Sequence, residues 1–234
     1  MSTVFQIAGW WARDYVYAVG RQLRAAVSRV SPEEFLSGTG RPVVVIPGIF
    51  EDWRFMLPLI RELHKAGHPV HVVTVLQRNR LAVPKAAALI ADYLQQRDLR
   101  DTVIVAHSKG GLIGKYAMMS LDSERRVSRM VAVCSPFSGS RYAGYMLLPS
   151  LRALSPRNAV TVQLSREQRV NERITSVYGL FDPHIPEGSV LPGARNIRLD
   201  TGGHFRILAQ EETIRTVLAE ADAPAPAAAA GTGG

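Results

Sequence analysis

The sequence predicts an α/β fold in which a mostly parallel central sheet is flanked by helices on both faces. Between residues 41 and 220, short β-branched and apolar runs alternate with longer segments of helical periodicity. Such alternation is typical of parallel strands that are covered on both sides by helices. The expected strands are 42–47, 69–76, 102–107, 129–134, 174–180 and 195–199, and the expected helices are 55–66, 83–97, 109–120 and 204–219.

The composition is that of one globular domain with short extensions. The chain has 234 residues, of which 47% are hydrophobic and 21% charged. The net charge of +8 comes from scattered residues without a basic stripe, so nucleic-acid binding is not expected. The start lacks a basic segment before an apolar one, and no apolar run is long enough to cross a membrane. These features predict a cytoplasmic protein, and the single cysteine, Cys134, cannot form an internal disulfide.

Residues 1–40 form an expected helical extension of the catalytic domain at 41–220. Apolar residues recur there at steps of three and four, which predicts an amphipathic helix packed on the domain. Trp10, Trp11 and the arginines leave peripheral membrane contact through residues 1–30 as an alternative. Residues 221–234 are a low-complexity tail that we expect to be disordered. The apolar positions of the helix are Val4, Ala8, Trp11, Tyr15, Val19, Leu23, Ala26 and Val30.

A candidate nucleophile stands where a predicted strand turns into a predicted helix. The segment Ala106-His107-Ser108-Lys109-Gly110 has small residues two positions before and two after its serine. A strained turn at that point brings the strand and the helix close together and needs small neighbours. Strand alternation points His107 away from Ser108, so His107 is expected to be a packing or hydrogen-bonding residue.

An oxyanion hole would need two backbone N–H groups near Ser108. Lys109 follows the serine and opens a helix, so its N–H is the first candidate. The second is expected in the loop after the strand at 42–47, where Pro47 and Gly48 lead into Ile49. We expect the N–H of Ile49 to serve, with that of Phe50 as the next choice.

The base and acid partners of such a serine follow it in the chain as an aspartate and then a histidine. His204 lies between a strand and the last helix, after two glycines, and is the expected base; His184 is its rival. Asp182 follows the strand at 174–180 and is the expected acid. Asp200 and Glu187 are the alternatives for this carboxylate.

No metal or organic cofactor is expected. His64, His68 and His71 lie close in sequence, but Gly67 and Pro69 interrupt the spacing that two ligands on one face would need. A serine–histidine–aspartate set requires neither a metal nor an organic cofactor for acyl transfer.

Four blocks together resemble the α/β-hydrolase superfamily, and within it the small bacterial esterases and triacylglycerol lipases. Pro47 and Lys109 depart from the residues usual in such lipases, which bears on acyl preference. The resemblance implies Ser108 as nucleophile, Asp182 as acid, His204 as base, and Ile49 with Lys109 as oxyanion donors. The blocks are PVVVIPGIFEDW, VIVAHSKGGLIGKYAM, SVYGLFDPHIPEGSVLPGARNIRL and GGHFRIL.

The expected function is cleavage of carboxylic esters of small molecules or lipids through an acyl-enzyme. Acyl transfer with the same triad and non-catalytic lipid binding are the alternatives. Phe50, Phe137 and Tyr142 are expected to line an acyl pocket, with the apolar run at 145–148 beside them. The irregular segment 136–172 is expected to form a small cap or a loop that faces lipid.

Overall fold

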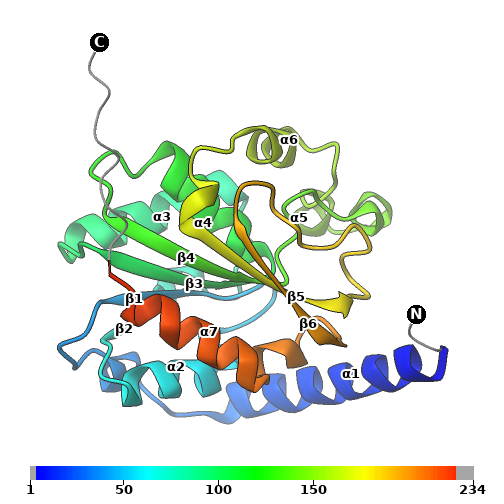
Figure 1. Ribbon diagram of the computed structural model, residues 1–234, viewed down its shortest axis with the longest axis horizontal. Coiled ribbons are helices and arrows are strands. Elements are labelled where there is room, and N and C mark those ends of the chain that lie inside the picture. Colours follow the sequence, from blue (N-terminus) through cyan, green and yellow to red (C-terminus); the bar gives the residue numbers. More distant parts are fainter. Residues whose placement is uncertain (1–3, 225–234) are drawn as a thin grey trace.

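The sheet consists of parallel strands, as predicted, in the computed structural model, which describes residues 4–224 (Figure 1). The strand order is β2-β1-β3-β4-β5-β6, and every neighbouring pair is parallel. Since β1 pairs with both β2 and β3, the crossover to β3 leaves the ends of β1 and β3 adjacent. The strands are β1 (Val43–Ile46), β2 (Val70–Val72), β3 (Thr102–His107), β4 (Val127–Val133), β5 (Ile174–Phe181) and β6 (Arg195–Gly202).

Helices cover both faces of the sheet, also as predicted. Figure 1 shows α1 (Val4–Val27), α2 (Leu57–Lys65) and α7 (Glu211–Asp222) on one face. The other face carries α3 (Val83–Gln96), α4 (Lys109–Ser120) and α6 (Ala159–Arg166), with the short α5 (Pro149–Arg152) near the strand ends.

The core divides into two apolar layers, one on each face of the sheet. Side chains alternate along the strands, so Ile104 and Ala106 of β3 enter the layer under α3 and α4. Val103 and Val105 enter the layer under α2 and α7. The central strands β1 and β3 are buried along their whole length, which explains why they read as apolar runs, whereas β6 at the edge of the sheet is mostly exposed.

Two element boundaries differ from the predictions. The strand expected at 69–76 ends at Val72 and is followed by the 3₁₀ turn η3 (Thr74–Leu76), because the chain there turns to hydrogen-bond the loop after β1 through Arg78 and Asn79. The helix expected from 204 begins only at Glu211, after the 3₁₀ turn η6 (Arg206–Ala209). The backbone before η6 forms an irregular loop whose Gly203 has a φ of 125°.

Helix α1 forms as predicted but presents a different face to the domain. The inner face carries Trp10, Asp14, Tyr17, Ala18 and Arg21, whereas most of the predicted apolar face, apart from Trp11 and Tyr15, points outward. Leu23 is 65% exposed and Val19 57%. The prediction was wrong because the inner face contains a buried carboxylate and a guanidinium, which hydrophobic periodicity cannot recognise. The guanidinium of Arg21 donates to the carbonyl oxygens of Arg54 at 2.7 Å and Phe55 at 3.1 Å.

The remaining segments connect these layers. Four further 3₁₀ turns are η1 (Pro32–Phe35), η2 (Trp53–Met56), η4 (Arg141–Tyr145) and η5 (Asn171–Arg173). Helix α7 continues to Asp222, so the expected tail boundary at 221 falls inside a helix; residues 225–234 of that tail lie outside the described residues. None of the helices within 4–224 is long and apolar enough to cross a membrane.

Candidate active site

Ser108 occupies a strained turn at the carboxyl end of β3. Its φ of 51° and ψ of −122° lie in a region that non-glycine residues rarely adopt. The turn lifts the side chain above the sheet, where the loops after β1, β5 and β6 converge. The strain is of the kind that proteins store at functional sites, with a cost of about 1–3 kcal/mol.

Gly110 permits the close approach that this turn requires. A Cβ at Gly110 would lie 2.3 Å from the carbonyl oxygen of Ile46 and 3.0 Å from that of Pro47. A Cβ at the next residue, Gly111, would lie 2.1 Å from Ser135 Oγ. The first turn of α4 therefore packs directly against the end of β1, and both positions need glycine.

The structure brings Ser108, His204 and Asp182 together from three different loops. Ser108 Oγ lies 2.9 Å from His204 Nε2, and His204 Nδ1 lies 2.7 Å from Asp182 Oδ2. The other carboxylate oxygen of Asp182 accepts the backbone N–H groups of His184 at 2.8 Å and Ile185 at 3.1 Å. Burial raises the pKa of Asp182, but the His204 ring and these donors outweigh it, so the net pKa is lowered and the carboxylate stays charged.

The rival residues do not form such a chain. The His184 ring lies beside the His204 ring, with centroids 4.8 Å apart and planes tilted by 46°, and His184 Nε2 lies 3.1 Å from the Tyr15 hydroxyl. Burial, with the neighbouring His204, lowers the pKa of His184 to about 4, so this ring is neutral at pH 7. Glu187 pairs with Arg141 at 2.8 Å, and Asp200 is exposed on β6.

Two buried side chains that the sequence analysis did not assign to the site hold the backbone of His204. Asp14 of α1 accepts the His204 N–H at 2.8 Å. His107 Nε2 donates to the His204 carbonyl oxygen at 2.9 Å, which agrees with the hydrogen-bonding role predicted for His107. The only sequence signal for Asp14 is that it is the sole acidic residue of α1.

Glu51 joins this arrangement to the loop after β1. Its carboxylate lies 2.9 Å from His107 Nδ1 and accepts the Gly48 N–H at 2.7 Å. Both ring nitrogens of His107 therefore face acceptors. Burial lowers the pKa of His107, but the Glu51 carboxylate and the His204 carbonyl outweigh it and raise the net pKa, which favours an imidazolium paired with Glu51.

The predicted oxyanion donors differ in their availability. The Phe50 N–H donates to the Arg78 carbonyl at 2.8 Å, so the second choice is occupied. Within residues 4–224 the Ile49 N–H has no partner, and Ile49 lines the pocket above Ser108. The Lys109 N–H begins α4, where the helical ladder leaves the first N–H groups open.

The Lys109 side chain points away from the pocket, contrary to the expectation that it bears on acyl preference. It is buried, and its ammonium donates to the carbonyl oxygens of Asn79, at 2.9 Å, and Leu81. Burial lowers the pKa of Lys109 to about 8. Asn79 in turn donates to the Pro47 carbonyl at 2.6 Å. Lys109 thus stabilises the loop after β1 indirectly, through Asn79.

A mostly apolar pocket of about 450 Å³ opens above Ser108 and His204. Phe50 and Tyr142 line it as predicted, with Met146, Leu151 and Leu154 from the segment expected to form a cap. Trp11 and Tyr15 of α1 complete its wall. Phe137 does not: it is 2% exposed in the core layer under α4, with Lys115 Nζ 5.9 Å from its ring. That prediction was wrong because burial and pocket lining leave the same apolar signature in a sequence.

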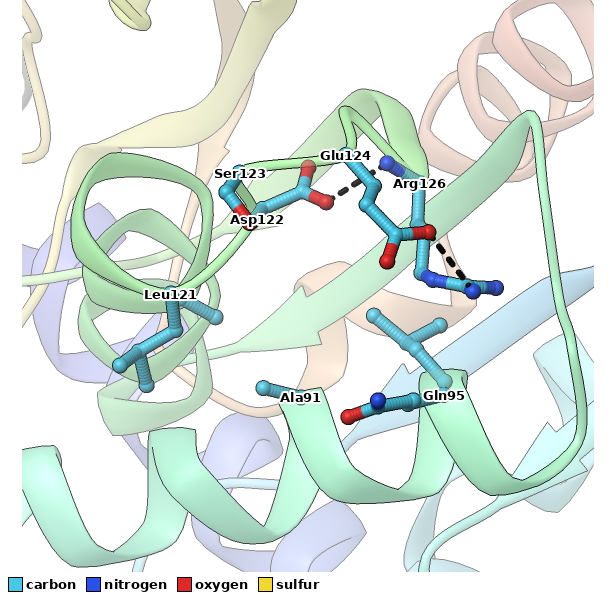
Figure 2. Close-up of a pocket in the computed structure, with 9 residues that line it drawn as sticks. Ala91, Gln95, Leu121, Asp122, Ser123, Glu124 and Arg126 are labelled. Carbon is cyan, nitrogen blue, oxygen red and sulfur yellow. Dashed lines mark hydrogen bonds and ion pairs between the residues drawn. The ribbon is translucent and has the colours of Figure 1, made fainter.

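A second hollow, of about 140 Å³, lies at the opposite ends of the strands (Figure 2). The segment after α4 lines it, before β4 begins. Figure 2 shows Asp122 and Glu124 reaching toward Arg126, at 2.6 Å from its N–H and 2.8 Å from its guanidinium. These charges satisfy one another and hold the turn, so this hollow is structural.

Cys134 and the remaining histidines have local partners. Cys134 is fully buried beside Asp182 and His204, and burial raises the pKa of its thiol well above the ordinary value. His64 pairs with Ser37, His68 with Asp222 and His71 with Tyr93. These three rings therefore point to three different neighbours.

Comparisons with known proteins identify the fold. No protein-family model and no curated protein matches the sequence. The crystal structure of mature lipase BlEst2 from Bacillus licheniformis is similar, with a TM-score of 0.63 and 17% identity over 79% of this chain and 93% of that one. An α/β-hydrolase enzyme from a Mar Chica lagoon sediment metagenome, MGS-MChE2, gives a TM-score of 0.57 and 17% identity over 79% and 91%. The enol-lactonase of Burkholderia xenovorans gives 0.53 and 12% identity over 78% and 92%. The chain therefore has the α/β-hydrolase fold, as its four sequence blocks implied.

Proposed function

We propose that this protein is a serine hydrolase that cleaves carboxylic esters with apolar acyl groups. The observation that carries the proposal is the continuous hydrogen-bonded chain from Ser108 through His204 to Asp182, at 2.9 and 2.7 Å, beneath an apolar pocket. This order of donors and acceptors is what a serine nucleophile, its base and an orienting carboxylate require. The solved structures of similar fold include a lipase, which agrees with this proposal.

Each residue has a defined part in the reaction. Ser108 Oγ attacks the ester carbonyl carbon while its proton passes to His204 Nε2, and Asp182 stabilises the imidazolium that forms. The N–H groups of Ile49 and Lys109 stabilise the charged oxygen of the tetrahedral intermediate. The intermediate collapses, and the departing alkoxide takes the proton from His204.

Water completes the cycle. It gives a proton to His204 and attacks the acyl-enzyme carbonyl, and the second tetrahedral intermediate releases the acid and returns the proton to Ser108 Oγ. An alcohol or thiol in place of water would give acyl transfer with the same residues. Hydrolysis is the simpler proposal because the pocket opens to solvent.

The pocket argues for an apolar acyl chain. Tyr142, Met146, Leu151 and Leu154 come from one segment, and Trp11 faces them from α1. A chain placed among these residues would gain about 0.8 kcal/mol for each methylene buried. Affinity should therefore rise with acyl length until the pocket is filled.

Hydrolysis of p-nitrophenyl esters from acetate to palmitate tests this function. Wild type should turn them over, whereas Ser108→Ala should lose at least about a thousandfold in kcat. Ser176→Ala is the matched control, because Ser176 is another buried serine whose hydroxyl donates to the Ser189 carbonyl, away from His204. An inactive wild type that also resists a serine-directed fluorophosphonate would refute the proposal and favour non-catalytic lipid binding.

The outer face of α1 supports a proposal about where such a substrate is met. Phe5 is 90% exposed, Val16 75% and Leu23 65%, and Trp11 of the same helix also lines the pocket. Figure 1 shows the N-terminal half of α1 extending past β6. Leu147, next in the chain to the pocket residue Met146, is 96% exposed. The apolar surface is thus continuous with the entrance of the pocket.

We propose that this surface contacts anionic lipid. The charged residues exposed on α1 are the basic Arg13 and Arg24, since its one acidic residue, Asp14, is buried. An apolar helix face bordered by arginines suits a bilayer surface that offers acyl chains and negative headgroups. The net charge of the whole chain, +8, acts in the same direction.

Co-sedimentation with phosphatidylglycerol and phosphatidylcholine vesicles tests the lipid contact. Wild type should bind the anionic vesicles more strongly, and Val16→Ser with Leu23→Ser should abolish that binding. Leu121→Ser removes an exposed leucine at the end of α4 and is the matched control. Unchanged binding by the double variant, or a dimer in sedimentation equilibrium that the double variant dissolves, would refute the proposal.

A further inference from the structure

Three consecutive backbone N–H groups of the His204 loop point at one carboxylate. Asp14 Oδ2 accepts from His204 at 2.8 Å, while Asp14 Oδ1 accepts from Phe205 at 2.8 Å and Arg206 at 2.7 Å. Asp14 is fully buried, and the partners of its carboxylate among residues 4–224 are these three N–H groups. The three N–H groups are therefore what compensates its charge in the interior.

The fit between this carboxylate and the loop is tight. Gly203 has a φ of 125°, and a Cβ there would lie 2.6 Å from Asp14 Oδ1. A Cβ at Gly202 would lie 2.5 Å from a ring carbon of Trp10, one helical turn before Asp14. The two glycines thus let α1 lie directly against the loop that carries His204.

The carbonyl group of His204 is also held by a hydrogen bond. The His204 carbonyl accepts from His107, whose other ring nitrogen pairs with Glu51. The peptide groups on both sides of His204 are thereby fixed by side chains from α1 and β3. With its backbone fixed, the imidazole is held with one nitrogen at Asp182 and the other at Ser108.

We propose that Asp14 is a positioning residue for His204, which makes α1 a part of the active site. This inference rests on the proposed esterase function, in which His204 is the base. Asp14 touches neither the substrate nor Ser108; it acts through the backbone of the base. A shift of about 1 Å in a catalytic group can cost about a hundredfold in rate, so loosening this loop should act on kcat.

The variant Asp14→Asn tests the proposal. It keeps the shape of the side chain but removes the charge and replaces one acceptor oxygen with an NH₂ group that faces N–H donors. We expect kcat for p-nitrophenyl esters to fall by about 10- to 100-fold, with KM within about twofold of wild type. The rate of fluorophosphonate labelling of Ser108, corrected for the folded fraction, should fall with kcat.

Arg21→Ala is the matched control. Arg21 also holds α1 on the domain, through the carbonyl oxygens of Arg54 and Phe55, but it does not contact the His204 loop. Both variants should lower the melting temperature, and Arg21→Ala should keep kcat within about twofold of wild type. If Asp14→Asn does not fold, Asp14→Ala, which introduces no competing donor, takes its place.

The outcomes separate this inference from the proposed function. Wild-type kcat in the folded Asp14 variants, or an equal loss of kcat in Arg21→Ala, would overturn the positioning role and leave the esterase function standing. A wild type that cleaves no ester and resists the fluorophosphonate would overturn the function itself. A loss of kcat confined to the Asp14 variants, with KM retained, supports the inference.

Discussion

Gly110→Ala is expected to damage both stability and catalysis, because this glycine sets the distance between β1 and α4. The added Cβ would lie 2.3 Å from the Ile46 carbonyl oxygen. Carbon and carbonyl oxygen pack no closer than about 3.3 Å in ordinary contacts, so β1 and the first turn of α4 must separate by about 1 Å. The Pro47 carbonyl oxygen would lie 3.0 Å from the added Cβ, so α4 cannot relieve the clash by shifting toward the loop after β1.

The separation would act on two parts of the proposed active site at once. Ser108 and the Lys109 N–H move with α4, while the Ile49 N–H stays with the end of β1. A misplacement of about 1 Å is expected to cost about a hundredfold in kcat. Forcing one methyl group into a packed interior should lower the free energy of unfolding by about 1–3 kcal/mol.

Gly20→Ala provides the comparison. Gly20 is also helical, but a Cβ there meets nothing within 4 Å. Alanine favours a helix over glycine by about 0.8–1 kcal/mol, so this variant should be slightly more stable than wild type and equally active. Urea denaturation and p-nitrophenyl ester kinetics measure both quantities. Equal stability and equal kcat for Gly110→Ala and wild type would refute the packing argument.

Two further predictions concern the pocket walls and pH. His184 keeps a pKa of about 4 in the folded protein against an ordinary 6.5, so below pH 6.5 the unfolded chain binds the proton and the folded one does not. This group should therefore remove up to about 3 kcal/mol from the free energy of unfolding as pH falls from 6.5 to 4. In His184→Gln, the free energy of unfolding should depend less steeply on pH across that range than in wild type. An unchanged slope would contradict a neutral His184 ring in the folded protein. Phe137→Ala should cost about 3–5 kcal/mol of stability as a core truncation. Tyr142→Ala should cost less than about 1 kcal/mol of stability and instead raise KM for long-chain esters. A raised KM in Phe137→Ala with a large loss of stability in Tyr142→Ala would contradict this assignment and indicate that Phe137 lines the pocket.

The sheet and the elbow could be predicted because their signals are local. The central strands β1 and β3 are buried on both faces and read as apolar runs, and the elbow needs small residues at fixed positions around Ser108. Asp182 and His204 each follow a strand, and parallel strands bring such loops to one edge of the sheet. In the structure, His204 lies within hydrogen-bonding distance of both Ser108 and Asp182.

The direction of single side chains could not be predicted. Phe137 and Lys109 are close in sequence to the pocket and to Ser108, yet one enters the core and the other braces a loop. Helix α1 has apolar residues around most of its circumference, so its periodicity did not reveal which side is buried. What selects the inner face is the fit of Asp14 to three N–H groups almost two hundred positions away in the chain, and no local pattern encodes that contact.

Because Cys134 is buried and is the only thiol of the chain, its reaction with a thiol reagent can report on local opening of the structure. Its Sγ lies 3.9 Å from the Gly203 carbonyl, under the loop that carries His204, and both its burial and its raised pKa suppress reaction with alkylating reagents in the closed state. The labelling rate of Cys134 would therefore measure how often this loop opens in the native protein. Bound acyl chains should slow that labelling, and loosening α1 should accelerate it. No cysteine has to be engineered for this measurement.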